Sequence, residues 1–113
     1  MSDNSLDVGG KGRNPIEVLP ETLPYGRILT ARDALVEVGE KLGLGDISVG
    51  NLIPGLVNFK GHVEFKPIQN KSTGKKVGFR VVGFMNGAMV FSVPLVYGNG
   101  KYTKVDALPP SYE

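Results

Sequence analysis

Cysteine and tryptophan are absent from this 113-residue chain, and histidine occurs once, at His62. The lack of cysteine excludes disulfide scaffolds, zinc ribbons and thiol nucleophiles. No stretch approaches the roughly 20 apolar residues of a membrane-spanning helix, and residues 1–4 lack the basic start and apolar run of a secretion signal. We therefore expect a soluble cytoplasmic protein, or a virion component if the protein is viral.

Glycine and proline are abundant, with 16 and 8 residues. A chain of this length hides about two-thirds of its unfolded surface, which is enough for one core. We divide the sequence into an extended N-terminal arm (residues 1–29), one α+β domain (residues 30–106) and a C-terminal tail (residues 107–113). No second domain is expected.

The N-terminal arm is punctuated by proline at positions 15, 20 and 24, a spacing that excludes a helix. Between these prolines Ile16, Val18 and Leu19 are too apolar for a freely solvated tail. We expect them to lie in a groove of the same subunit or of a neighbour.

A helix is predicted over residues 31–42. Thr30 is a suitable N-cap, Asp33 follows it as in a capping box, and Gly43 provides the stop. Apolar residues recur on one stripe of this helix, namely Ala31, Ala34, Leu35, Val38 and Leu42. Residues 44–56 show no clear period, and we expect a connector with one short helical turn at most.

From residue 57 the apolar period becomes two, which indicates strands. The alternation from Val57 to Lys66 predicts the first strand, and residues 77–85 and 88–97 form a hairpin around a type I′ turn at Asn86-Gly87. A second turn at residues 98–100 leads into residues 101–106. The fold class is therefore α+β and mostly β, a four-stranded antiparallel meander with one helix, either open or closed as a small barrel or sandwich.

The central hairpin is predicted to be apolar on both faces if each residue pairs regularly outward from the turn. One face then holds Val77, Phe79, Val81, Met85, Ala88, Val90 and Val96. The other holds Val82, Phe84, Met89, Phe91, Val93 and Leu95, with Arg80 as its only charge. One helix covers one face, so the second needs barrel closure, the arm or another subunit. Pro94 lacks a ladder donor and leaves a flank where a neighbour's residues 16–19 could add as a strand.

Catalytic motifs are not evident. His62 lies on the predicted solvated face with no nucleophile to assist, and neither Gly43-Leu44-Gly45 nor Gly98-Asn99-Gly100 completes a phosphate-binding pattern. We expect no enzyme activity, no cofactor, no metal and no small-molecule substrate.

Charge is unevenly distributed along the chain. Residues 1–56 hold eight acidic and five basic side chains, whereas residues 57–104 hold eight basic side chains and one acidic, Glu64. The basic set is Lys60, Lys66, Lys71, Lys75, Lys76, Arg80, Lys101 and Lys104. With Tyr97 and Tyr102 as stacking rings, it predicts binding of single-stranded nucleic acid or another polyanion. Alternatively, the acidic and basic parts complement each other between neighbouring subunits.

The tail contains Pro109-Pro110-Ser111-Tyr112. This motif resembles the PPxY peptide that WW domains bind, as found in the late domains of enveloped-virus matrix proteins, and the resemblance covers these four residues. It implies a peptide contact through Pro109, Pro110 and Tyr112. The alternative is a proline-stopped tail whose Tyr112 packs on a neighbour.

The arm, the two-faced hairpin and the missing catalytic groups favour a non-enzymatic structural protein that self-associates or docks into a larger shell. A virion minor capsid, decoration or matrix-like component fits this description. The alternative function is polyanion binding by the basic sheet.

Overall fold

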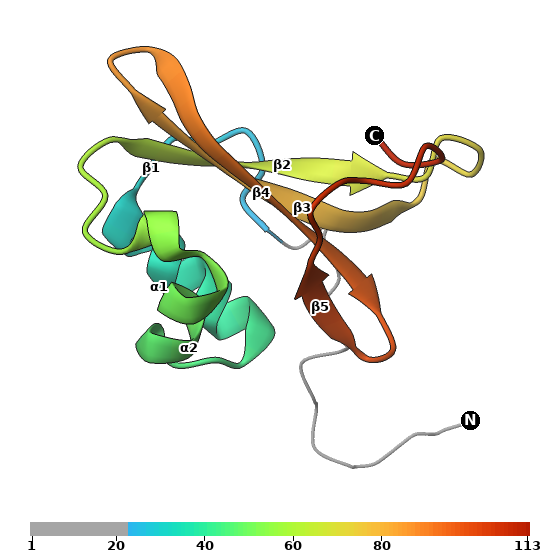
Figure 1. The fold of residues 1–113 in the computed structure, drawn as a ribbon, viewed down its shortest axis with the longest axis horizontal. Coiled ribbons are helices and arrows are strands. Elements are labelled where there is room, and N and C mark those ends of the chain that lie inside the picture. Colours follow the sequence, from blue (N-terminus) through green and yellow to red (C-terminus); the bar gives the residue numbers. More distant parts are fainter. Residues whose placement is uncertain (1–22) are drawn as a thin grey trace.

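The structure is a computed structural model that describes residues 23–113. Its sheet contains β1 (Leu29–Thr30), β2 (His62–Gln69), β3 (Lys76–Met85), β4 (Ala88–Gly98) and β5 (Lys101–Lys104), which are antiparallel neighbours in chain order. The helices are α1 (Ala31–Leu42), α2 (Asp46–Leu52) and the short 3-10 helix η3 (Pro54–Leu56) (Figure 1). The mostly β, α+β class is confirmed. The sheet has five strands rather than four, and it is open because β1 and β5 do not pair.

Helix α1 has the predicted bounds. The Asp33 N–H donates to Thr30 Oγ1 over 3.1 Å, and Gly43 ends the helix with a φ of 71°, which a glycine adopts without strain. Ala34 and Val38 are fully buried under the sheet. The helix thus fixes one apolar stripe against the strands, as its spacing predicts.

Residues 44–56 are more helical than expected. They form α2 and η3, which bury Val49, Ile53 and Leu56. Ile53 follows Val49 by four residues and Leu56 follows Ile53 by three, which is the spacing that places side chains on one face of a helix. Gly50 and Pro54 hide this spacing in the sequence. The expected connector with little helix is therefore wrong for residues 44–56. Helices α1 and α2 both lie on the same side of the sheet (Figure 1).

Strand β2 begins at His62, five residues later than predicted. Asn58 has a φ of 59°, a left-handed conformation that breaks an extended chain, and Val57 is 50% exposed. The backbone at Gly61 passes so close to Phe84 that a side chain at position 61 would overlap the Phe84 carbonyl. The alternation of residues 57–60 therefore belongs to a loop.

The β3–β4 ladder has a bulge that corrects the predicted pairing of the hairpin. Phe84 pairs with Met89 as expected, but Gly83 pairs with Phe91, which leaves Val90 as the extra residue. Val82 then lies opposite Ser92 instead of Phe91. Every residue of β4 beyond the bulge is shifted by one position, and its side chain changes face.

The shifted register gives the sheet one strongly apolar face. The core cluster of sheet and helices includes Leu29, Ala34, Val38, Val49, Ile53, Leu56, Val63, Phe65, Phe79, Val81 and Leu95. The far face of the central strands alternates apolar residues such as Val82 with polar ones such as Glu64, Lys66 and Arg80. The predicted face of Phe91, Val93 and Leu95 is therefore wrong, because these residues lie on the core side, whereas Val82, Phe84 and Met89 stay on the far face with Arg80.

The tail returns to the sheet (Figure 1). The Val105 N–H donates to the Pro94 carbonyl over 3.1 Å. Gln69 and Glu113 then exchange backbone hydrogen bonds of 2.8 and 2.9 Å, and the Lys71 N–H donates to the Ser111 carbonyl over 2.8 Å. Residues 111–113 thus extend the ladder on the outer edge of β2.

Candidate interaction surfaces

The end of the β3–β4 hairpin is apolar and exposed. Met85, Met89 and Val90 are 36%, 62% and 54% exposed. The turn between the strands is held by Asn86 and Gly87, whose φ angles of 54° and 82° are those of a type I′ turn. The hairpin projects away from the helices (Figure 1). Exposed apolar side chains gathered at one place are typical of an interaction surface.

A shallow hollow of about 310 Å³ lies beside this hairpin end. Ile28, His62, Glu64 and Phe84 contribute to its walls, and Ile28 is 72% exposed. Ile28 is not among the predicted contact residues, which in the arm are confined to Ile16, Val18 and Leu19. Its position next to Leu29, another apolar residue, is the signal in the sequence that could have identified it.

The predicted hairpin contact residues are divided between the two faces. Met89 is exposed and Phe84 half-buried on the far face, where Val82 is 2% exposed. On the helix face Leu95 is fully buried, and Phe91 and Val93 pack against the core. Met89 and Phe84 are thus the two that a partner can reach most readily. The predicted arm contacts, Ile16, Val18 and Leu19, lie outside the described residues.

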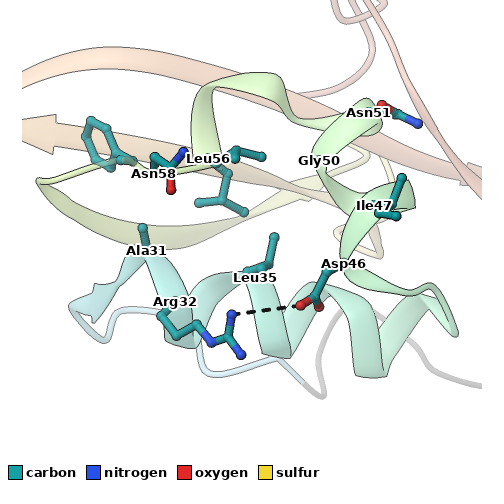
Figure 2. Close-up of a pocket in the computed structure, with 11 residues that line it drawn as sticks. Ala31, Arg32, Leu35, Asp46, Ile47, Gly50, Asn51, Leu56 and Asn58 are labelled. Atoms are coloured by element: carbon teal, nitrogen blue, oxygen red, sulfur yellow. Dashed lines mark ion pairs between the residues drawn. The ribbon is translucent and has the colours of Figure 1, made fainter.

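A second hollow of about 530 Å³ lies between α1, α2 and the loop before β2 (Figure 2). Leu35 of α1 and Leu56 of η3 point toward each other across it. Arg32 Nη1 and Asp46 Oδ2 form an ion pair of 3.8 Å at its margin, and both side chains are mostly exposed. The sequence did not predict this hollow because α2, one of its walls, was not expected as a helix. Its walls mix apolar side chains with polar ones, among them Asn51 and Asn58.

Four lysines lie toward the end of the sheet opposite the hairpin turn, three of them on or beside the β2–β3 loop and the fourth at the start of β5. They are Lys71, Lys75, Lys76 and Lys101. Within residues 23–113, none of them forms an ion pair. The loop is ordered by Asn70, whose Oδ1 accepts from the N–H groups of Ser72 and Thr73 over 2.9 and 3.2 Å. We call these four lysines the basic end.

The other predicted basic residues lie apart from the basic end. Lys66 and Arg80 are opposite each other on β2 and β3, on the far face. Lys66 Nζ is 3.8 Å from the Glu64 carboxylate, and Arg80 Nη1 donates to Ser92 Oγ over 3.5 Å. Lys60 precedes β2 near the hairpin end, and Lys104 closes β5 opposite Leu95.

The two tyrosines proposed as stacking rings pack on each other. The centroids of Tyr97 and Tyr102 are 5.1 Å apart at an angle of 63°, and Tyr102 also meets the buried Phe79 edge to face at 5.4 Å. Both are half-buried. These rings therefore connect β4 and β5 to the margin of the core.

The PPxY segment is folded onto the sheet. The Tyr112 N–H donates to the Pro109 carbonyl over 3.0 Å, which makes a turn, and Tyr112 pairs with Asn70 in an isolated β-bridge. Tyr112 is half-buried while Pro109 and Pro110 are exposed. A WW domain binds this motif in an extended conformation, so binding would require the segment to leave β2.

Groups that could carry chemistry are sparse in the described part of the chain. His62 is exposed on β2 and has no hydrogen-bond partner among the side chains of residues 23–113. No cluster of three or more potential metal ligands occurs in those residues. None of the helices in the same range has the length and apolar character needed to cross a membrane.

Comparisons of the chain with protein-family models, with curated proteins and with solved structures found no match.

Proposed function

We propose that this protein is a non-enzymatic structural protein that self-associates or docks into a larger assembly. The observation that carries this proposal is the exposed apolar end of the β3–β4 hairpin. Residues 81–100 contain no charged side chain, and this stretch includes the whole turn and all of β4. A partner that buries such a surface removes apolar area from water without desolvating a charge.

The size of the gain supports contact with a partner. Full burial of a large apolar side chain is worth about 1.5–3 kcal/mol, and Met89 and Val90 each leave more than half of their surface exposed. Ile28 lines the hollow beside Phe84 on the same face as Met89, and its burial would add to the gain. Such a gain is consistent with an anchor cluster at the centre of a protein contact.

The kind of assembly is proposed from the sequence of the arm. Ile16, Val18 and Leu19 are apolar anchors between prolines, and arms of this type suit attachment to a neighbouring subunit. This pattern fits a shell component, for instance a minor capsid, decoration or matrix-like protein of a virion.

Light scattering after size exclusion tests the proposal. We expect the mass to exceed that of the 12.1 kDa monomer and to rise with concentration. Met89→Glu should shift the protein toward monomer, since Met89 is 62% exposed and tolerates a carboxylate without disturbing the core. Ile47→Glu is the matched control, because Ile47 is 83% exposed on α2, away from the hairpin. A wild-type monomer at every concentration would contradict self-association.

A second candidate function is polyanion binding, and the basic end is the observation that favours it. Four lysines without ion pairs within residues 23–113 lie on an ordered loop and at the starts of β3 and β5, which point the same way in the sheet with β4 between them. Their charges can follow a phosphate backbone, and the affinity should then depend strongly on salt.

A further inference from the structure

The two edges of the sheet are protected to very different degrees. An edge strand presents unpaired backbone N–H and C=O groups, and proteins usually block it with proline, charge or a covering segment. The outer edge of β2 has all of these devices. It is paired with β1 at Val63 and with residues 111–113 at Gln69, and Lys66 and Pro67 lie between.

Among residues 23–113, no segment covers the outer edge of β4 over residues 88–93. Strand β5 pairs only with Leu95–Gly98, and the Val105 N–H reaches no further than the Pro94 carbonyl. Within residues 23–113 no strand or loop forms backbone hydrogen bonds with residues 88–93 on that side. Alternate residues of an antiparallel strand direct their backbone groups outward. This segment therefore offers a short row of unpaired donors and acceptors.

The side chains along this bare edge offer no electrostatic protection either. Residues 88–93 include no charged residue, and Met89 and Val90 are exposed. The bulge at Val90 twists the strand locally, but the residue that it adds is apolar and 54% exposed. An edge of this composition favours pairing over repulsion.

We propose that the partner on this edge is a second copy of the same chain, whose residues 88–93 pair antiparallel with those of the first about a two-fold axis. This inference rests on the proposed self-association and specifies its geometry. A two-fold contact requires a surface that complements itself, and an uncharged strand with apolar neighbours meets this condition. An edge that bound an acidic partner would carry basic side chains, and one that bound a basic partner would carry acidic ones, whereas residues 88–93 carry neither.

The position of the edge in the fold permits this approach. The turn end of the hairpin projects beyond the helical layer (Figure 1), so a second hairpin can approach this end from the side away from the helices. The turn at Asn86–Gly87 limits the pairing at one end, and β5 with Val105 limits it at the other. Six residues span about 20 Å of ladder, which is the usual length of a strand in a sheet.

Cysteine cross-linking tests this arrangement directly, because the chain has no cysteine of its own. Single cysteines are introduced at Ala88, Met89, Val90, Phe91, Ser92 or Val93, and each variant is oxidised mildly at a concentration where it self-associates. Two-fold antiparallel pairing places at most one position opposite itself, at a Cα separation that a disulfide can bridge, and its sequence neighbours come next in proximity. We expect disulfide-linked dimers to peak there and to decline on both sides.

A charge at the edge provides the second measurement. Val90→Lys places two like charges close together across the two-fold axis, and we expect the dimer dissociation constant to rise at least about tenfold. Ile47→Lys on α2 is the control and should leave the constant unchanged. Val90 is exposed, so circular dichroism of Val90→Lys should match that of the wild type.

The outcomes separate this inference from the proposed function. A wild type that associates, with no cross-linking in residues 88–93 above that of Ile47→Cys, would overturn the edge pairing and leave self-association standing. Equal cross-linking at all six positions would also overturn it, since that pattern indicates collisions. A wild type that is monomeric throughout would overturn both.

Discussion

The ring of Phe91 lies directly over Gly83, its partner across the β3–β4 ladder, and fills the space that a side chain at position 83 would occupy. The same ring meets Phe59 edge to face at 5.0 Å. A β-carbon at Gly55 in η3 would lie 3.3 Å from it. Phe91 thus joins both hairpin strands, the loop before β2 and the short helix η3, just after the bulge at Val90.

Gly83→Ala should destabilise the protein by about 1–3 kcal/mol, because the added methyl group overlaps the Phe91 ring and forces it to move. Chemical denaturation monitored by circular dichroism measures the loss. Gly98→Ala is the control, since a β-carbon at Gly98 meets no atom within 4 Å. Equal stability of Gly83→Ala and wild type would show that the ring is not fixed there.

Leu95→Ala should lower the free energy of unfolding by roughly 2–5 kcal/mol, because Leu95 is fully buried between sheet and helices. Met89→Ala should change that free energy far less, since Met89 is 62% exposed, but it should weaken self-association. Denaturation of dilute protein and light scattering of concentrated protein measure the two effects. A stable Leu95→Ala variant that fails to associate would instead place Leu95 at an interface.

Replacing Lys75 and Lys76 by Glu should reduce affinity for a short single-stranded oligonucleotide by at least about tenfold at low salt, because two phosphate contacts are replaced by repulsion. Fluorescence anisotropy at several salt concentrations measures it. Wild-type affinity should fall steeply with salt. The double variant Arg32→Glu with Lys41→Glu makes the same charge change on α1 and should have a smaller effect. An affinity independent of salt would refute polyanion binding.

Removal of residues 111–113 should cost about 1–3 kcal/mol of stability, because three backbone hydrogen bonds to Gln69 and Lys71 are lost. The truncated chain should also aggregate more readily, since part of the β2 edge becomes unpaired. Thermal unfolding and turbidity measure the two effects. Ser111→Ala is the control, because it keeps every backbone group in place. Unchanged turbidity after truncation would mean that the tail does not protect this edge.

The parts of the fold that follow from local rules were predicted well from the sequence. Helix α1 is defined by Thr30 and Gly43, and the hairpin turn by Asn86-Gly87, and each signal acts over a few residues. Capping and turn conformation depend on residues that are adjacent in the sequence, so these signals can be recognised without knowledge of the tertiary structure.

The face assignment of β4 was not predictable in the same way. It depends on the bulge at Val90, next to which Phe91 packs on Gly83 across the hairpin and on Phe59, which is distant in the sequence. A single extra residue reverses the face of Phe91, Val93 and Leu95. The predicted contact surface changed accordingly, and Ile28 entered it from a segment that had been assigned to the arm.

The basic end was only partly predictable. The excess of lysine over residues 57–104 is visible in the sequence. Which of these lysines lie at the same end of the sheet depends on the order and direction of the strands. Lys71 and Lys75 share a loop, and Lys101 lies toward the same end of the sheet because β3 and β5 run in the same direction. Lys60 precedes β2 at the other end of the sheet, and Lys104 lies further along β5.

The pairing of residues 111–113 with the end of β2 has a consequence for synthesis of the protein. Residues 69–71 leave the ribosome about 40 residues before their partners, and at roughly 5–20 residues per second this part of the strand waits several seconds without them. During that interval nascent chains on one messenger RNA are exposed to each other. During this time the strand is protected locally, by the charge of Lys66 and by Pro67, which has no backbone N–H to donate to a neighbouring nascent chain.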